Sequence, residues 1–458
     1  MPRILILAHY FYPSAAVGAK RMAELACLLR DEKWEVTVVS STADAVPELA
    51  ERIQDIDVTT VRLPPKLYPA IAYWPKRLLR WYRTRRSGGN PGGNAGSMSS
   101  RREPASGKRE GVVGWLKRHY HAMESIIDES KLWSFKVLLR TLRIRKSYDW
   151  IISSGPPHSI HVTAALVSLV TGARWIMDLR DPWVCNHNWP DKERSASAVR
   201  DRIERFLERK CVGRAHGVTV ASPGIAVALR ARIPWSADKV NVVLNGYDRR
   251  MESSVNARGG LRLLYAGSLY LNRNPFPLLD ALRELLSLPH VDRRRVSFIL
   301  VGQCESWNGH DVAAWVQAAG MQDVVRILPP VPPAEVGAMM RDAEVLVNFA
   351  QGQPEQIPAK VYDYIAAGRE MLLIAETDSD AARITRESGM GRIVDPDDPV
   401  GLRSTLRELY AFYVEEERAL EVDEERVKRF SREYQNRQFL QLFTKPQEGA
   451  ACQAQEDL

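Results

Sequence analysis

The chain contains 458 residues, of which 45% are apolar and 26% are charged. At roughly 150 residues per domain, this length corresponds to about three domains or to two larger ones. The composition is that of a soluble globular protein, and it excludes a fully disordered chain or a disulfide-stapled miniprotein. The net charge of +8 and the pI near 9.2 indicate an anionic partner, either a nucleic acid or a membrane surface.

The five cysteines are scattered, and no C-x-x-C pair occurs among them (Cys27, Cys185, Cys211, Cys304 and Cys452). This pattern predicts reduced thiols in a cytosolic protein and gives no support to a zinc or redox site. No apolar run reaches the roughly 18 residues that a membrane span needs. The N-terminal segment lacks the cleavage region of a signal peptide, so we expect it to form a first strand in a cytoplasmic protein.

Short β-branched or apolar runs alternate with amphipathic helices in the first half. Arg3–Ala8 is a predicted strand, Lys20–Arg30 has helical periodicity, and Trp34–Ser40 is a second predicted strand. After an interruption, further strands are predicted at Trp150–Ser153, Trp175–Asp178, Gly217–Ala221 and Val240–Leu244. Alternation of this kind indicates a parallel sheet covered by helices. The interruption includes residues 84–110, which are rich in Gly, Ser, Asn and Arg and are predicted to be disordered.

The same alternation restarts in the second half. Strands are predicted at Leu261–Ala266, Val296–Val301, Glu344–Phe349 and Glu370–Ala375. Helices are predicted near Pro277–Leu288, Ala334–Arg341, Ala359–Ala367 and Leu402–Glu417. We therefore expect an N-terminal domain over 1–247, a linker near 247–260 and a C-terminal domain over 259–428. The segment 429–458 is predicted to be a helix near Ser431–Phe443 that crosses back onto the first domain, followed by a polar tail.

Two acidic residues define the most specific segment, PEQIPAKVYDYIAAG, where Glu355 and Asp363 lie eight residues apart before Gly368. If a helix begins near Ile357, Glu355 precedes its N-terminus and Asp363 lies nearly two turns inside it. The unpaired N–H groups of a helix N-terminus suit a phosphate, and carboxylates beside them suit sugar and ribose hydroxyls. Taken alone, the spacing more often marks two solvated acids near a helix start.

With its neighbours, this segment resembles family 4 of the glycosyltransferases, whose C-terminal domain carries Glu-x7-Glu before a small-residue helix and Gly. In this chain the second acid is Asp363. The family also has Gly-Arg-Leu-x-x-x-Lys-Gly after a strand, and its Arg and Lys hold the donor diphosphate. This chain reads AGSLYLNRN, in which Gly267 matches, Ser268 replaces the Arg and Arg273 stands in place of the Lys. Lys360 is our candidate for the missing cation.

The resemblance extends from Arg3 to about Phe443. The sequence NGYD at 245–248 is similar to the family's Asn-Gly-x-Asp at the hinge between its two domains. The first strand is followed by Pro and a loop containing Gly18, where many members have two or three glycines in a row. The resemblance implies an α/β GT-B fold, in which two Rossmann-like parallel-sheet domains face a cleft, and a retaining reaction.

The segment 153–183 closely resembles a bacterial subgroup of the family that builds surface polysaccharides. Its recurrent marks are Pro-Pro-His before a helix and Asp-Leu-Arg-Asp-Pro-Trp after a strand. Many family members have a His-Asp pair where this chain has Arg180 and Asp181, so the catalytic role of that His does not carry over directly. His158 is a further catalytic candidate, although a lone His is more often structural. The predicted acceptor side therefore comprises His158, His161, Asp178, Arg180 and Asp181, at the carboxyl ends of parallel strands.

The resemblance implies a nucleotide-diphosphate sugar on the C-terminal domain and a glycan acceptor on the N-terminal domain. Arg273, Lys360 and a helix N-terminus would stabilise charge on the leaving diphosphate. Glu355 would bind the sugar hydroxyls, and Asp363 the ribose. The other predicted donor contacts are Gly18, Gly267, Ser268, Gly302 and Val331. We expect no cofactor besides the donor substrate and no metal, because no Asp-x-Asp motif occurs where such enzymes would hold one.

Three alternatives remain open on the sequence. A GT-B nucleotide-sugar epimerase shares the fold, although the Glu355–Asp363 segment and the Pro-Pro-His segment argue against it. A non-catalytic protein could instead bind a membrane or nucleic acid through its basic residues. A catalytically inactive homologue acting as a scaffold is compatible with the departures at Ser268 and Arg180.

The basic charge is concentrated in one stretch. Between Lys76 and Arg118, twelve Lys or Arg residues face two acidic residues, which gives this stretch +10 and leaves −2 for the rest of the chain. Aromatic residues are interleaved with the charges (Trp74, Trp81, Tyr82 and Trp115). Such a tract suits an anionic membrane better than a nucleic acid. We therefore expect residues 74–120 to bind the inner face of the plasma membrane and the acceptor to be a lipid-linked glycan.

Overall fold

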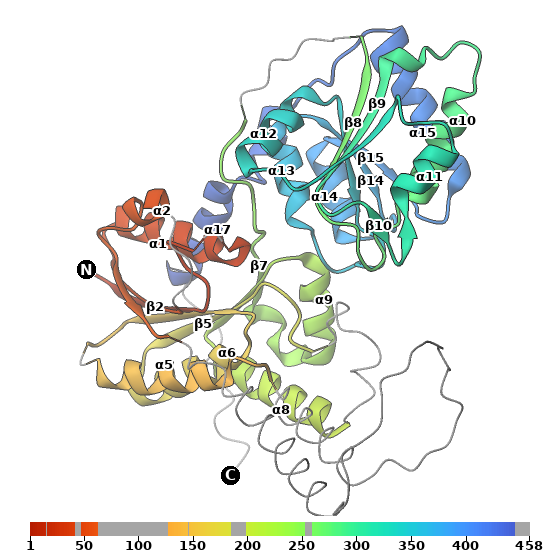
Figure 1. The fold of residues 1–458 in the computed structure, drawn as a ribbon. Helices are drawn as coiled ribbons and strands as arrows, with labels where there is room; N and C mark the ends of the chain where they lie inside the picture. Colours follow the sequence, from red (N-terminus) through yellow and green to blue (C-terminus); the bar gives the residue numbers. More distant parts are fainter. Residues whose placement is uncertain are drawn as a thin grey trace, which may run out of the picture.

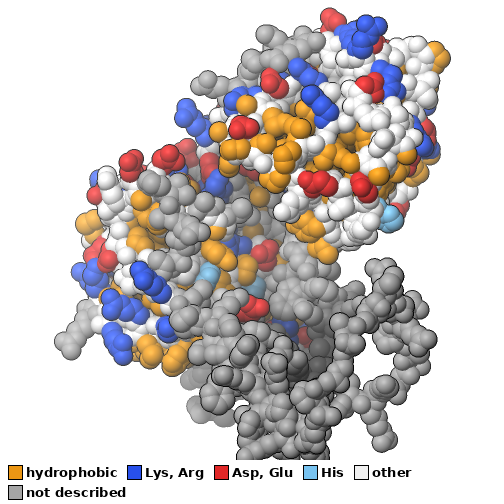
Figure 2. Space-filling model, in the orientation of Figure 1, with side chains coloured by type: hydrophobic (Ala, Val, Ile, Leu, Met, Phe, Trp, Pro, Cys, Tyr) orange, Lys and Arg blue, Asp and Glu red, His pale blue; other side chains and the backbone are white. Residues whose placement is uncertain are grey.

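The computed structural model describes residues 1–14, 16–41, 47–62, 127–144, 146–184, 198–251 and 259–444. Each half of the chain builds one large parallel sheet covered by helices, and the halves form two lobes (Figures 1 and 2). The predicted α/β class with two Rossmann-like sheets is confirmed. The basic tract at 74–120 lies outside the described residues, as do Cys185, Cys452 and the tail after Thr444.

The N-terminal sheet has seven strands in the order β3-β2-β1-β4-β5-β6-β7, all paired in parallel. These are β1 (Arg3–Ala8), β2 (Glu35–Ser40), β3 (Asp57–Thr60), β4 (Trp150–Gly155), β5 (Arg174–Leu179), β6 (Gly217–Val220) and β7 (Val240–Val242). Strand order reverses between β1 and β4, which is where a doubly wound sheet opens a crevice for ligands.

Helices cover both faces of this sheet, as a buried parallel sheet requires. The helices are α1 (Lys20–Asp31), α2 (Pro47–Glu51), α5 (Lys131–Arg143), α6 (Ser159–Thr171), α8 (Ala198–Arg214) and α9 (Pro223–Arg232). Because side chains of a strand alternate between faces, Ile4 packs in the core with α1, whereas Leu5 packs in the core with α5 and α6. The helix α17 (Arg432–Thr444) closes the first of these cores with Phe439 and Phe443.

The C-terminal sheet has six strands in the order β12-β9-β8-β13-β14-β15. These are β8 (Leu261–Ala266), β9 (Val296–Val301), β12 (Val325–Leu328), β13 (Val345–Phe349), β14 (Glu370–Ile374) and β15 (Gly391–Val394), and a short hairpin joins β10 (Ser306–Trp307) to β11 (His310–Asp311). The helices are α10 (Phe276–Leu286), α11 (Val312–Ala318), α12 (Pro333–Asp342), α13 (Ala359–Ala367), α14 (Asp380–Ser388), α15 (Pro399–Tyr410) and α16 (Glu424–Lys428).

The last helix predicted in this domain differs in its bounds. Instead of Leu402–Glu417, α15 begins at Pro399, because the Asp398 side chain accepts a hydrogen bond from the Gly401 N–H and caps the helix. After Tyr410 the chain continues as a π-helical turn over Ala411–Glu415.

The chain passes between the lobes twice, and the two connecting segments are hydrogen-bonded to each other. Residues 245–248 run beside the start of α17, with Tyr247 bridged to Ser431. Arg432 donates to the backbone carbonyls of Asn245 at 2.7 Å and Gly246 at 3.0 Å. Gly246 has a φ of +69°, and a Cβ at this position would lie 2.7 Å from the backbone nitrogen of Arg432. Glycine is therefore required where the two segments cross.

Candidate active site

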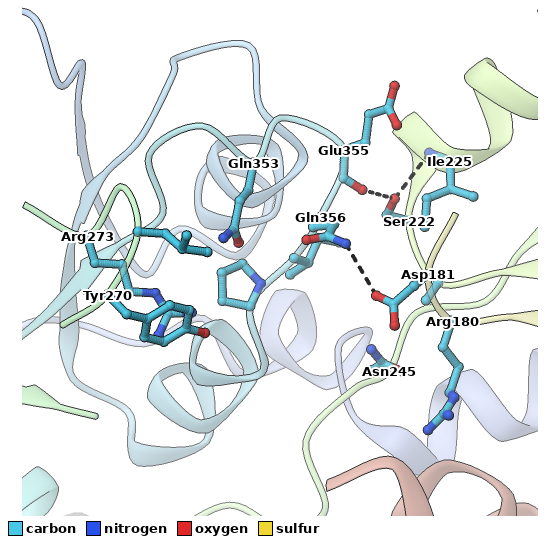
Figure 3. A pocket seen from close by; sticks show the side chains of 14 residues that line it. Arg180, Asp181, Ser222, Ile225, Asn245, Tyr270, Arg273, Gln353, Glu355 and Gln356 are labelled. Atoms are coloured by element: carbon cyan, nitrogen blue, oxygen red, sulfur yellow. Dashed lines mark hydrogen bonds between the residues drawn. The ribbon is translucent and has the colours of Figure 1, made fainter. Parts of the chain in front are cut away.

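A cavity of about 430 Å³ lies between the two lobes (Figure 3). Its walls come from segments that directly follow strands of both sheets, which is where open α/β sheets bind ligands. The lining residues are Arg180, Asp181, Ala221, Ser222, Ile225, Asn245, Tyr270, Leu271, Arg273, Gln353, Glu355, Gln356, Ile357 and Pro358. The structure thus brings the predicted acceptor-side residues Arg180 and Asp181 into one cavity with the predicted donor-side residues Arg273 and Glu355.

Two cations converge beneath the C-terminal wall of this cavity. The buried Lys360 Nζ has no hydrogen-bond partner and lies 4.0 Å from the centre of the Tyr265 ring. Arg273 stacks on Tyr270 at 4.2 Å, and its buried Nε likewise has no partner. Burial, followed by repulsion from Arg273, lowers the pKa of Lys360 to about 7. Two under-paired cations at one place are suited to an anionic ligand, which would restore the Lys360 charge.

Gly267 makes the close approach of Lys360 possible. Its φ is +147°, and a Cβ at this position would lie 2.1 Å from the Lys360 Nζ. Gly302 is equally constrained, with a φ of +127°, because a Cβ there would lie 2.1 Å from the Gly267 carbonyl oxygen. The Ser268 carbonyl accepts hydrogen bonds from Tyr265 at 2.8 Å and Arg273 at 3.5 Å. The loop after β8 therefore positions both cations through its backbone.

The helix beside these cations begins at Ala359 and not near Ile357. Pro358 explains the difference, because a residue that precedes proline avoids the helical conformation. Asp363 consequently lies little more than one turn inside α13 and is exposed. It faces Lys20 of the other lobe, whose ammonium pairs with Asp248 at 2.9 Å. Gly368 ends the helix in the left-handed conformation, with a φ of +66°.

Glu355 is half-buried on the loop that leads to α13, and its backbone is held by the other lobe. The Ser222 hydroxyl donates to the Glu355 carbonyl oxygen at 2.5 Å. In Figure 3 the Glu355 carboxylate extends away from Asp181, whereas the neighbouring Gln356 side chain points toward it. Gln356 donates to Asp181 at 3.4 Å. Both contacts join the donor-side loop to the predicted acceptor side.

Arg180 links two loops of the N-terminal lobe. It donates to the carbonyls of Gly18 at 2.8 Å, Gly155 at 3.3 Å and Pro156 at 2.5 Å. A Cβ on Gly18 would lie 2.1 Å from the Arg180 Nη1, so this glycine leaves room for the guanidinium. Asp181, at the cavity wall, has a pKa raised by burial, which suits a carboxyl group that hydrogen-bonds an acceptor hydroxyl.

His158 and His161 lie behind this wall and are buried. The His158 ring stacks on Trp183 at 5.4 Å, and the His161 Nδ1 lies 2.8 Å from the Ser153 hydroxyl. Burial lowers the pKa of His161 to about 3 and the pKa of His158 well below its usual value, so both rings are neutral at neutral pH. The His158 Nδ1 and the His161 Nε2 have no hydrogen-bond partner. Neither residue lines the cavity.

Asp178 is fully buried and does not line the cavity. Its carboxylate accepts hydrogen bonds from Arg21 at 2.8 Å, Ser154 at 2.8 Å and Thr219 at 2.7 Å. Arg21 in turn donates to the Leu244 carbonyl at 2.9 Å. Asp178 therefore fixes the hinge through Arg21 in this structure. Val331 also does not line the cavity and packs, half-buried, against the core beneath α12 and α13.

The contacts between the lobes at the start of α9 were not predictable from the sequence. Besides the bond from Ser222, the Gly224 N–H donates to the Asp380 carboxylate at 2.6 Å. A Cβ on Gly224 would lie 3.0 Å from the Glu355 Cα. The only available signal was Ser-Pro-Gly after a strand, which predicts a capped helix start but not what faces it.

Comparisons with known proteins identify the family to which the chain belongs. The model of the glycosyl transferase 4-like domain matches residues 18–246, which is half of the chain. The chain belongs to the glycosyl transferase 4-like family. No curated protein sequence matches it.

Solved glycosyltransferase structures match the fold of this chain over almost its whole length, at low sequence identity. A glycosyltransferase from Rickettsia africae is 11% identical, with a TM-score of 0.56, 97% of this chain and 98% of that chain covered. Anabaena Alr3699/HepE in complex with UDP-glucose is 14% identical, with a TM-score of 0.54, and the match covers 96% of this chain and 99% of that chain. The lipopolysaccharide outer core galactosyltransferase WaaB is 13% identical, with a TM-score of 0.55, and the match covers 96% of this chain and 99% of that chain. The predicted GT-B fold is therefore confirmed.

Membrane-spanning helices and metal-binding clusters are both absent from the described residues. No helix among them is long and apolar enough to cross a bilayer. No group of three or more His, Cys, Asp or Glu side chains in that part of the chain could hold a metal ion. Cys27, Cys211 and Cys304 are buried free thiols.

Proposed function

We propose that this protein transfers a sugar, with retention of configuration, from a nucleotide-diphosphate donor to a lipid-linked glycan acceptor in cell-surface polysaccharide biosynthesis. The observation that carries the donor assignment is a pair of half-buried cations, Lys360 and Arg273, whose Nζ and Nε atoms are buried. Neither the Lys360 Nζ nor the Arg273 Nε has a hydrogen-bond partner, and both lie beside the start of α13. A diphosphate would supply the missing negative charge and accept from the helix N-terminus.

The donor would then lie across the wall formed by the C-terminal lobe. Lys360 and Arg273 would neutralise the diphosphate, Glu355 would orient the sugar through its hydroxyls, and Asp363 would bind the ribose. The solved complex of a similar fold with UDP-glucose supports a donor of this class. The backbone near Val331 and Gly302 would contact the base, since the Gly302 N–H donates to the Leu328 carbonyl at the end of β12.

The acceptor would enter from the N-terminal lobe, beside Asp181. In the transfer, the bond between the anomeric carbon and the diphosphate oxygen breaks and the electron pair leaves with the nucleoside diphosphate. The acceptor oxygen bonds to the same face of that carbon, and its proton passes to the leaving phosphate. Arg180 and His158 would act by fixing the Gly18 and Pro156 loops around the acceptor. The bonds from Ser222 to Glu355 and from Gln356 to Asp181 support a closed cleft that excludes water.

The surface-polysaccharide role is supported by the Pro-Pro-His and Asp-Leu-Arg-Asp-Pro-Trp segments, and one similar structure is a lipopolysaccharide galactosyltransferase. The basic and aromatic tract at 74–120 supports a lipid-linked acceptor and peripheral attachment at the inner face of the plasma membrane.

The test begins with thermal shifts of the purified protein against UDP-, GDP- and dTDP-sugars, which identify the donor. Release of nucleoside diphosphate is then measured with and without lipid-linked glycan acceptors. We expect release that depends on the acceptor, and its loss in Glu355→Ala with an unchanged unfolding temperature. Full activity in Glu355→Ala would refute the assignment. Turnover of UDP-GlcNAc without an acceptor would identify an epimerase instead.

A further inference from the structure

Helix α5 presents apolar side chains on the outside of the N-terminal lobe. Its inner face is buried through Trp133, Val137 and Thr141. The opposite face exposes Leu132 (59%), Phe135 (56%), Leu139 (41%) and Leu142 (45%). The spacing of three, four and three residues places these side chains in one stripe along the helix. A contiguous stripe of four large exposed apolar side chains indicates an interaction surface, whereas scattered single ones do not.

Basic residues border this stripe. Lys136, Arg140 and Arg143 are exposed on α5, and the helix contains no acidic residue. None of the three forms an ion pair with another described residue. At 100° per residue they follow one edge of the stripe, and Lys131 lies at its other edge. Figure 2 shows blue and orange side chains next to one another at the lower left of the N-terminal lobe, where α5 lies in Figure 1.

The apolar character continues onto α6, which packs beside α5 on the same face of the sheet (Figure 1). Leu166, Leu169 and Val170 are exposed there by 43%, 67% and 68%, and α6 contains no charged residue. The helix α8, which contacts α6, adds an exposed Phe206 (57%) with the Lys210 ammonium over its ring.

We propose that this face of α5 and α6 docks onto an anionic lipid surface, with the apolar stripe entering the headgroup region and the bordering cations binding lipid phosphates. A stripe flanked by cations is the arrangement of interfacial helices. A second copy of the chain is disfavoured as the occupant, because pairing two α5 helices would bring their basic edges together without any acidic residue on either helix.

The location of this face suits a lipid-linked acceptor. Asp128, which precedes α5, accepts hydrogen bonds from the Ser159 N–H at 2.7 Å and the Ser159 hydroxyl at 2.8 Å. Ser159 begins α6 and follows His158 of the predicted acceptor side. The docking face and the acceptor side are thus joined through Asp128 and Ser159. In the sequence, the basic tract at 74–120 ends eleven residues before α5 begins.

The docking face deepens the lipid-linked part of the proposed function, but vesicle binding requires neither donor nor transfer. The test measures binding of the full chain to vesicles of phosphatidylcholine with 30% phosphatidylglycerol, and to pure phosphatidylcholine, by co-sedimentation. Phe135→Ser/Leu139→Ser should bind the anionic vesicles at least about tenfold more weakly than the wild type. Arg140→Gln/Arg143→Gln should lose about fivefold per charge. The control Val400→Ser/Tyr434→Ser alters exposed apolar residues elsewhere and should bind normally.

Three results would overturn the proposal. The first is normal vesicle binding by Phe135→Ser/Leu139→Ser together with loss of binding on deletion of 84–110, which would assign attachment to the basic tract alone. The second is a wild-type dimer that this variant converts to a monomer, which would assign the face to a second copy. The third is equal binding of the wild type to neutral and anionic vesicles. If the wild-type protein binds anionic vesicles but transfers no sugar, the proposed function is refuted and the docking face is still supported.

Discussion

Replacing Lys360 by Met should stabilise the unliganded protein and weaken donor binding at the same time. Met keeps the packing of the side chain over Tyr265 and removes a buried ammonium without a hydrogen-bond partner. The pKa of Lys360 is lowered from 10.5 to about 7, so the folded state binds fewer protons than the unfolded state between those values. The resulting destabilisation is therefore fully present below pH 7, where it is at most about 5 kcal/mol at 1.4 kcal/mol per pH unit. It falls to about 3 kcal/mol at pH 8 and vanishes above pH 10.5.

Thermal unfolding at pH 6.5, 8 and 10 measures this effect. At about 2–4 °C per kcal/mol for a domain of this size, Lys360→Met should raise the midpoint clearly at pH 6.5 and not at pH 10. Because a hydrogen bond to a charged group contributes about 1.5–3 kcal/mol, the affinity for the donor nucleotide should fall about 10- to 150-fold. Lys428→Met, on the exposed side of α16, is the matched control and should change neither quantity. A variant that is less stable than the wild type at pH 6.5 and binds every tested nucleotide-sugar normally would refute this reasoning.

Three further outcomes are expected. Glu355→Gln should lower transfer by about 100-fold or more with an unchanged unfolding temperature, measured as nucleoside diphosphate release and by calorimetry. Asp178→Asn leaves Arg21 buried without its counter-charge, so chemical denaturation should show a loss of about 3–5 kcal/mol; an unchanged midpoint would mean that the pair contributes nothing. Ser222→Ala removes the α9 cap and the bond to the Glu355 carbonyl, so the unfolding temperature should fall slightly and donor hydrolysis should rise relative to transfer.

The fold could be predicted from the sequence because its signals are local. The runs at Arg3–Ala8 and Val296–Val301 form strands as expected. Weaker elements gave no signal. The strand β15 is only four residues long and half-buried, and the hairpin β10–β11 pairs two residues on each side. Periodicity cannot identify runs of that length.

The candidate site was predictable only in part, because a motif states which residues are close in the chain and not which way they point. Arg273 and Glu355 lie on one cavity wall as the motifs indicated. Asp178 stands two residues before Arg180 in the same motif, yet it lies within β5 and is fully buried, whereas Arg180 follows the end of that strand and lines the cavity. A start of α13 near Ile357 is wrong by two residues, because Pro358 disfavours the helical conformation at Ile357.

In the proposed donor site, Ser268 stands where the resembling family motif has an Arg, and a cation from another part of the chain would take the place of that Arg. The loop after β8 carries one cation, Arg273, and the hydroxyl of Ser268 cannot supply the second. Lys360 reaches the same loop from α13, a distant part of the chain, and arrives against Gly267 because that residue has no side chain. Tyr265 supports this arrangement from below, since its ring lies under the ammonium and its hydroxyl holds the Ser268 carbonyl. The Lys360 ammonium is consequently poorly solvated until an anion binds. The charge of Lys360 would therefore depend on whether the donor is bound, whereas an Arg, with its much higher pKa, would stay charged in both states.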